Sequence, residues 1–284
     1  MAGPALAADP VAASPAADRP PAPGARSALL LLLGINLFNY IDRYVLAAVE
    51  PQIARAFFGG AENDAETLTK TGSLATAFIV SYMLAAPLFG WLADRMSRWL
   101  LIGLSVLVWS LATGASGLAG TFAFLVICRC FVGIGEAGYG PAAPTVIADL
   151  YPVSRRGAVL AWFYMAIPVG SALGFAIGGL IGPMHHSEGW RWAFFAVTPP
   201  GILLALVCFF RRDARRSADG SPSGPPRKLR PADYLALLRN KSYVLDCLGM
   251  TAMTFAIGGV SFSAPPKNAR AICGSTAAST YRSM

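Results

Sequence analysis

The stretch Leu125–Pro144, LVICRCFVGIGEAGYGPAAP, is apolar apart from one basic and one acidic residue. Within it, four residues recur at steps of four, three and four, the spacing that places side chains on one face of an α-helix: Arg129, Gly133, Glu136 and Gly140. Ionisable groups at bilayer depth are costly unless they are paired or face water. A membrane helix with this face would turn it inward, where it marks a transport pathway or forms a purely structural ion pair.

The composition indicates a polytopic membrane protein. Of the 284 residues, 55% are hydrophobic and 13% are charged, whereas soluble domains carry about 25% charged residues. The net charge of +8 is compatible with nucleic-acid binding. However, the basic residues sit in short segments between apolar runs, where the positive-inside rule accounts for them. We therefore expect an all-α membrane bundle in a lipid bilayer and no nucleic-acid partner.

The sequence holds no pattern for covalent or metal chemistry. Cys128 and Cys130 are two residues apart, so on a helix they point to different faces and would not bind one metal. His185 and His186 stand in a polar loop, where a solvated pair is expected. There is no Ser/His/Asp or Cys/His constellation and no phosphate-binding glycine loop after a strand. We expect no metal, no cofactor and no enzyme activity.

Six membrane spans are expected in a transmembrane bundle over residues 28–210, after an Ala- and Pro-rich, disordered tail over residues 1–27. Their expected ranges are 28–49, 72–93, 99–119, 121–150, 158–183 and 190–210. A polar loop is expected over 55–71. The fourth span should break or end near Pro141 and Pro144, because proline removes a helical hydrogen bond.

After the sixth span, the chain is expected to alternate between polar and apolar segments. Residues 211–241 form a basic loop, residues 242–262 a seventh transmembrane helix, and residues 263–284 a polar, aperiodic tail. The basic loop is the strongest positive-inside signal, so it should be cytoplasmic. Six spans then place the N-terminus in the cytoplasm too. Other basic residues fall on the same side: Arg95, Arg98, Arg155 and Arg156.

The first span carries unusual polarity for a lipid-exposed helix. Three- and four-residue spacing groups several of its polar side chains on one face: Asn36, Asn39, Tyr40 and Arg43. Asp42 and Arg43 would snorkel to the headgroups if they stood at the end of the span. Because they stand well inside it, we expect them to face the protein interior.

Glycine patterns predict where helices approach closely. In the fifth span, GSALGFAIGG spaces Gly170, Gly174 and Gly178 at four residues, a small-residue stripe that permits close helix contact. We assign helix packing to this stripe together with Gly179. In the fourth span the same role is expected of Gly133 and Gly135.

Several of these segments resemble the motifs of major facilitator superfamily transporters. GWLADRMSRW, residues 90–99, is similar to the family's loop between its second and third helices, with matches at Gly90, Asp94, Arg95 and Arg98. Arg129, Gly133, Gly135 and Ala137 match the fourth-helix pattern. GSALGFAIGG resembles the fifth-helix antiporter pattern, with Phe175 in place of its proline. The resemblance implies the six-helix N-terminal half of a major facilitator fold plus the seventh helix.

Within the superfamily, residues 28–260 resemble the Spinster branch. The resemblance is carried by NYIDR at 39–43, GIGEAGYGPAAPTVIADLYP at 133–152 and TAMTFAIGG at 251–259. It implies a transporter of lysophospholipids or sphingolipid-like molecules, coupled to protons, with a polar cluster of Asp42, Arg43, Arg129 and Glu136 below a partly apolar cavity. A small organic anion or a drug is the alternative substrate.

The residues agree with that implication. A carboxyl group away from water binds a proton more readily, so we expect Glu136 to be the proton carrier. Arg129 would contact an anion, and Asp42 and Arg43 would form a coupled pair. Asn39 and Tyr40 would line the same pathway. The resemblance implies that Gly90, Asp94, Arg95 and Arg98 belong to a cytoplasmic gate.

The resemblance also implies a missing C-terminal half, since alternating access uses two six-helix halves. Three explanations are open. The polar tail after residue 262 is the mark of a frameshifted or wrongly assigned reading frame, the chain is a half-transporter that forms a homodimer, or it is a regulatory half-protein that does not transport. In each case we expect a multi-pass protein of the plasma membrane, in a bacterium the inner membrane.

Overall fold

The computed structural model describes residues 20–59, 65–184, 188–211 and 239–263. Those residues form eight α-helices and no strand. The helices are α1 (Ala25–Phe58), α2 (Ala65–Ala93), α3 (Arg98–Gly117), α4 (Phe122–Leu150), α5 (Val153–Tyr164), α6 (Ala166–Met184), α7 (Gly189–Phe209) and α10 (Lys241–Ser263). The expectations for the N-terminal tail before residue 20, for His185 and His186, and for most of the basic loop and the polar tail lie outside the described residues.

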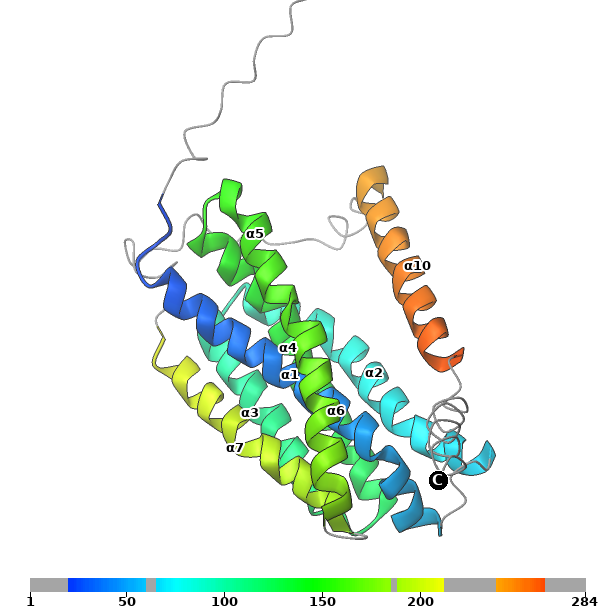
Figure 1. Cartoon of the computed structure of the whole chain (residues 1–284). Coiled ribbons are helices and arrows are strands. Elements are labelled where there is room, and N and C mark those ends of the chain that lie inside the picture. The colour runs from blue at the N-terminus through cyan, green and yellow to red at the C-terminus, as the bar shows by residue number, and fades with distance from the viewer. Residues whose placement is uncertain (1–19, 60–64, 185–187, 212–238, 264–284) are drawn as a thin grey trace, which may run out of the picture. The chain divides into compact units, whose positions relative to one another are not determined.

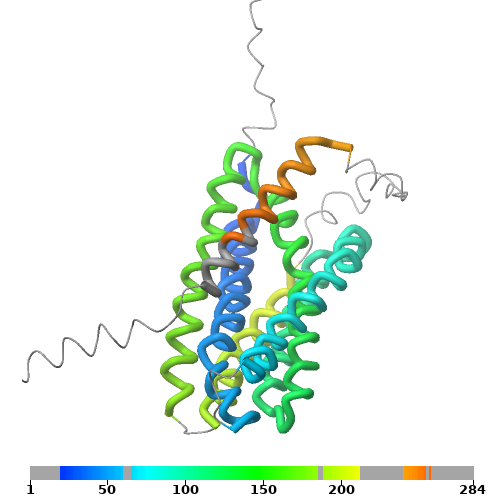
Figure 2. Tube along the Cα trace, turned by 90° about the vertical axis from the view of Figure 1, so that its right-hand side faces the viewer, coloured from blue at the N-terminus to red at the C-terminus, as the bar shows by residue number. Residues whose placement is uncertain are grey.

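The chain divides into two units, residues 1–223 and 224–284, of which the first holds a bundle of seven helices and the second holds α10. In the bundle, α2 packs along α4, α1 along α6, and α3 against both α4 and α7. Figures 1 and 2 show these helices side by side along their length. The expected all-α helical bundle is confirmed.

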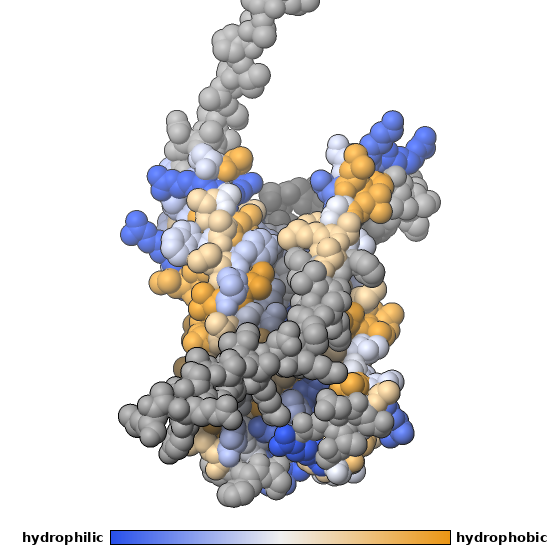
Figure 3. Space-filling model, turned by 45° about the vertical axis from the view of Figure 1, so that its right-hand side comes forward, coloured by the Kyte–Doolittle hydropathy of each residue, from blue (hydrophilic) through white to orange (hydrophobic). Residues whose placement is uncertain are grey.

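Six stretches of the described chain are long and apolar enough to cross a membrane. They are α1, α2, α3, α4, α5 with α6 taken together, and α7. Large apolar side chains cover much of the outer surface, as a lipid-facing bundle requires, including Leu84, Leu180 and Leu203. Figure 3 shows hydrophobic residues along the flanks of the bundle and hydrophilic residues gathered toward its ends. The chain is an integral, multi-pass membrane protein.

The first two helices are longer than the expected spans. α1 continues past residue 49 to Phe58 and ends at Gly59, whose positive φ of 76° lets its N–H close the helix on the Arg55 carbonyl. α2 begins at Ala65. Much of the loop expected over 55–71 is therefore helical, because helices extend beyond the hydrocarbon region wherever the chain can continue their hydrogen bonds.

The expected break in the fourth span is wrong. α4 begins where the Thr121 hydroxyl accepts the Phe124 N–H, and it runs unbroken through Pro141 and Pro144. The break falls instead in the fifth span, between Tyr164 and Ala166. Pro168, four residues after Tyr164, has no N–H to return to the Tyr164 carbonyl, which weakens the helix at that point.

The glycine stripe of α6 lies against α1. A Cβ atom at Gly170 would stand 2.7 Å from the Cβ of Tyr40, and one at Gly174 would stand 2.7 Å from the Ile41 carbonyl oxygen. A Cβ atom at Gly178 would stand 2.6 Å from the Cβ of Ala48. Gly179, which we expected to share this role, has open space instead, because it is rotated by one residue away from the contact.

Candidate functional site

An ion pair between α1 and α4 forms the centre of the candidate site. Arg43 donates from Nε to Oε2 of Glu136 over 2.8 Å, and its Nη2 donates to the same oxygen. The Glu136 side chain is 1% exposed and the Arg43 side chain 36% exposed. The acid is therefore enclosed by protein, while the base reaches a surface of the bundle.

Aromatic side chains surround the Arg43 guanidinium. Its carbon lies 4.7 Å from the ring centroid of Phe78 on α2 and 5.5 Å from that of Tyr40 on α1. Tyr82, also on α2, lies near enough to interact electrostatically with both members of the pair. Asn39 stands beside the Glu136 carboxylate. Three helices thus meet at this pair.

Asp42 and Arg129 belong to a second, fully buried cluster. Asp42 accepts a 2.6 Å hydrogen bond at Oδ2 from the Thr113 hydroxyl on α3. Arg129 donates from Nη2 to the Ser116 hydroxyl over 2.7 Å, and its guanidinium lies 5.3 Å from the ring centroid of Phe194 on α7. Asp42 is 3% and Arg129 is 2% exposed. The two charges interact electrostatically with each other.

The structure therefore pairs the four predicted charges differently from the sequence-based expectation. Asp42 and Arg43 are neighbours in sequence, but about 100° of helical rotation separates them, so one faces α3 and the other faces α4. Arg43 pairs with Glu136 across the bundle. Thr113, Ser116, Phe78 and Tyr82 were not predicted, because nothing in sequence spacing relates α2 or α3 to these charges.

Several buried polar atoms of the site lack a hydrogen-bond partner. Among the residues that the structure describes, Oδ1 of Asp42, Oε1 of Glu136 and Nε of Arg129 are buried without a hydrogen-bond partner. Buried polar atoms are nearly always paired, so these unpartnered atoms distinguish the site from an ordinary apolar interior. Within the site two acids balance two bases. In the described part of the chain there is no group of acidic, histidine or cysteine side chains able to hold a metal.

The four residues expected at a cytoplasmic gate do not all contact one another in the structure. Arg98, at the start of α3, is 3% exposed and forms an ion pair with Asp149 near the end of α4. The guanidinium carbon of Arg95 lies 3.9 Å from the ring centroid of Trp91, and Asp94 is exposed. Gly90 has open space around it. Asp149 was missed, although it stands at the same membrane end as Arg98 in the predicted topology.

The fold and the buried charges define a multi-pass membrane protein with a polar interior, and its family follows from comparison with known proteins. Residues 32–277 match the Major Facilitator Superfamily. The chain belongs to this superfamily, as its motifs predicted.

The similarity to Spinster proteins is confirmed. The chain is 40% identical over 250 residues to human protein spinster homolog 1, covering 84% of this chain and 45% of the relative. It is 35% identical over 235 residues to protein spinster of Drosophila melanogaster, covering 83% and 37%. A zebrafish (Danio rerio) relative, the sphingosine-1-phosphate transporter SPNS2, is 34% identical over 241 residues, covering 83% and 46%. The chain spans about half the length of these relatives or less.

Solved structures agree with this placement. A bacterial homolog to the human lysosomal transporter Spinster, in an inward-facing and unoccupied conformation, matches with a TM-score of 0.64 and 29% identity. The match covers 76% of this chain and 49% of that one. A D-xylose-proton symporter matches with a TM-score of 0.58 at 21% identity, covering 67% and 48%, which shows the shared fold alone.

Proposed function

We propose that this protein serves secondary active transport of an amphiphilic anion, a lysophospholipid or a sphingolipid-like molecule, coupled to protons. The Arg43–Glu136 pair carries the proposal, because it joins an enclosed acid to a base that reaches a surface. The name of the zebrafish relative, a sphingosine-1-phosphate transporter, supports a lipid phosphate as substrate. A small organic anion would use the same charges and is the alternative.

The pair suggests how proton and substrate are linked. When Glu136 takes up a proton, it loses the charge that holds Arg43. The Arg43 guanidinium is then available to an anionic headgroup, for which its planar set of donors is well suited. We therefore propose Arg43 as the anion contact in place of Arg129, whose guanidinium is 2% exposed and bound to Ser116. Arg129 is proposed to balance the charge of Asp42.

Two halves are needed for alternating access in this superfamily, and the chain spans about half the length of its relatives. We propose that activity of this chain on its own requires a homodimer. The second copy would supply the other side of the pathway and cover the half-exposed Arg43. If the chain does not form a dimer, we propose instead that it is a regulatory half-protein that does not transport.

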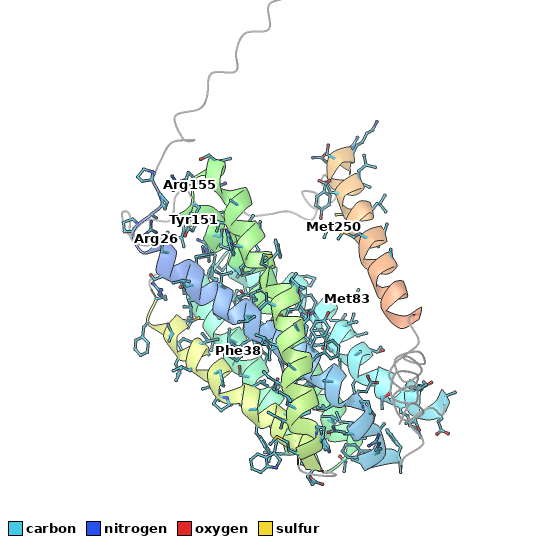
Figure 4. The ribbon with its side chains drawn as sticks, viewed as in Figure 1. Arg26, Phe38, Met83, Tyr151, Arg155 and Met250 are labelled. Carbon is cyan, nitrogen blue, oxygen red and sulfur yellow. The ribbon has the colours of Figure 1, made fainter. Side chains whose placement is uncertain are left out.

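Charge at the two ends of the bundle supports an orientation. One end holds the starts of α1, α3 and α5 and the ends of α2, α4 and α7; its charged residues are Arg26, Arg95, Arg98, Arg155, Arg156 and Arg211 with Asp94 and Asp149. Figure 4 shows Arg26, Tyr151 and Arg155 together there. The described charges of the other end balance: Arg55, Lys70 and Arg191 with Glu50, Glu66 and Glu188. We propose that the first end is cytoplasmic in a plasma membrane.

The experiment is proton-coupled transport of lysophosphatidic acid by the full chain in liposomes, with Glu136→Gln as the test variant. Glu66→Gln is the matched control, since that side chain is 73% exposed at the start of α2. We expect substrate uptake and proton movement in the wild type and in Glu66→Gln, and loss of proton coupling in Glu136→Gln. Transport that continues with coupling in Glu136→Gln would contradict the proton role, and a folded chain that transports nothing would contradict transport by this chain alone.

A further inference from the structure

Phe78 brings a third helix to the Arg43–Glu136 pair. The pair joins α1 and α4, whereas Phe78 belongs to α2. Its ring centroid lies 4.7 Å from the guanidinium carbon of Arg43. A guanidinium within about 6 Å of an aromatic centroid is attracted to the ring face, most strongly where water is excluded. The ring therefore has an energetic interaction with the ion pair as well as a packing role.

Most of α2 has no fully buried side chain. Its buried residues are confined to its first part, at Thr67, Thr71 and Leu74. Beyond them the helix has one outward face, on which Met83 is 65% exposed (Figure 4). The position of α2 beside the ion pair therefore depends on its contact with α4.

Two glycines of α4 allow that contact close to the ion pair. Gly133 lies about one turn before Glu136 and Gly140 about one turn after it. A Cβ atom at Gly133 would overlap the Phe78 carbonyl oxygen, and one at Gly140 would lie 2.7 Å from the Tyr82 hydroxyl. The backbone of Phe78 thus rests directly on α4 beside the acid, which determines where its ring lies. Of the α4 face that was recognised from sequence spacing, the two glycines receive α2, whereas Glu136 reaches α1 and Arg129 reaches α3.

The Phe78 ring still attracts the Arg43 guanidinium when Glu136 is neutral. A protonated Glu136 no longer offers Arg43 a negative charge, but the ring faces of Phe78 and Tyr40 remain beside the guanidinium. A buried or half-buried charge without any compensating contact is strongly unfavourable. An aromatic face supplies that contact without competing for the proton.

We propose that Phe78 is a positioning residue for the Arg43–Glu136 pair. Its ring holds the guanidinium beside the carboxylate, keeps it in place when Glu136 takes up a proton, and ties the position of α2 to the state of the pair. This role rests on the function proposed above only in that the proton is taken to be the one coupled to transport. Its physical content, an attraction between a ring and a cation, is tested without transport.

The test compares the effect of Phe78→Leu on unfolding of the full chain in detergent micelles in two backgrounds. The first is the wild type, and the second carries Arg43→Gln with Glu136→Gln, so that no buried charge is left unpaired. Lost packing is common to both backgrounds, and the ring–cation attraction exists only in the first. We expect Phe78→Leu to raise the equilibrium constant of unfolding in both backgrounds. The increase should be about threefold to thirtyfold larger in the wild type than in the neutral background.

Phe89→Leu is the matched control. Phe89 is a half-buried aromatic residue of the same helix, and its ring packs against α4 at Gly138. No arginine stands over its ring among the residues that the structure describes. Its substitution should cost the same in both backgrounds. An equal cost of Phe78→Leu in the two backgrounds would overturn the proposal.

Fluorinated phenylalanines at position 78 keep the test valid if the leucine variant does not fold. Fluorine withdraws charge from the ring face and leaves its shape nearly unchanged. We expect stability to fall stepwise with the number of fluorines in the wild-type background and to stay level in the neutral one; a level series in both would overturn the proposal. A positive result in a chain that does not transport would contradict only the proposed function, and Glu136-dependent transport with a level series would contradict only the role of Phe78.

Discussion

At the scale of single residues, glycine and threonine decide how the charges are held. Gly133 lets α2 rest on α4 beside Glu136, and Thr113 gives Asp42 its hydrogen bond from α3. Neither residue is charged, and neither would be selected as functional from its type. Both act by determining which neighbour a buried charge can reach.

Gly133→Ala should destabilise the chain by roughly 1–3 kcal/mol, because the new methyl group overlaps the backbone of Phe78 and α2 must move. Gly179→Ala is the control, since a Cβ atom there meets nothing within 4 Å and alanine favours a helix. Thermal unfolding of both variants in detergent measures the difference. Equal stability of the two variants would show that α2 does not depend on this contact.

Thr113→Val should cost about 1–3 kcal/mol, because it leaves the Asp42 carboxylate without its donor in a buried site. Thr145→Val removes a hydroxyl that bonds only to the Ala142 carbonyl within its own helix, at an exposed position. Unfolding measurements should show little change for that variant. A similar small effect of Thr113→Val would mean that Asp42 finds another partner.

At the scale of elements, α5 is the least anchored helix of the bundle. Its one buried residue is Phe163, just before the break in the fifth span. The Phe163 carbonyl accepts a 2.8 Å hydrogen bond from Nδ2 of Asn36, a buried amide on α1. Its ring also packs against that of Tyr139 on α4, with 6.3 Å between the ring centroids. Phe163 is therefore the main buried anchor of α5, with Val159 and Leu160 packed less deeply against the same core.

Asn36→Leu should release that anchor and raise amide hydrogen exchange about tenfold over residues 153–165, the effect of losing one buried hydrogen bond. Tyr139→Phe is the control, because it removes another buried hydrogen bond to α1, from the Tyr139 hydroxyl to the Leu32 carbonyl. That bond does not involve α5. Exchange measured by mass spectrometry in nanodiscs should rise in α5 only for Asn36→Leu, and a uniform rise over the bundle would contradict a local anchor.

At the scale of the whole molecule, the charge at the two ends of the bundle is the basis of the proposed orientation in the membrane. The apolar flanks are compatible with either orientation, whereas the two ends differ in their balance of arginine and acidic residues. Basic residues are retained on the cytoplasmic side during insertion. The proposed orientation therefore depends on the total charge of each end and not on any one residue.

Cysteines placed at the two ends test this orientation. In intact cells, a membrane-impermeant maleimide should label Glu188→Cys, at the start of α7, and should label Arg155→Cys, at the start of α5, only after the cells are opened. Both positions are exposed, so access alone distinguishes them. The unsubstituted chain measures background labelling of the natural cysteines. The reverse pattern would invert the proposed topology.

The membrane spans and the fold class follow from the sequence, because apolar runs of sufficient length have one stable solution in lipid, the α-helix. The motif residues were also enough to predict the superfamily and the Spinster resemblance. The predicted break at Pro141 was wrong, since a local proline signal does not show how neighbouring helices hold the chain.

The sequence also predicted that four charged residues lying well inside apolar spans would turn toward the protein, and three of them are buried: Asp42, Arg129 and Glu136. Only the tertiary structure decided their partners. Arg43 meets Glu136 across 93 residues of chain, while Asp42 turns to α3 and Arg129 is enclosed. The physical reason is that a partner depends on how each helix is rotated and how closely it approaches its neighbour. Those quantities are determined by packing between helices and not by the pattern along any one of them.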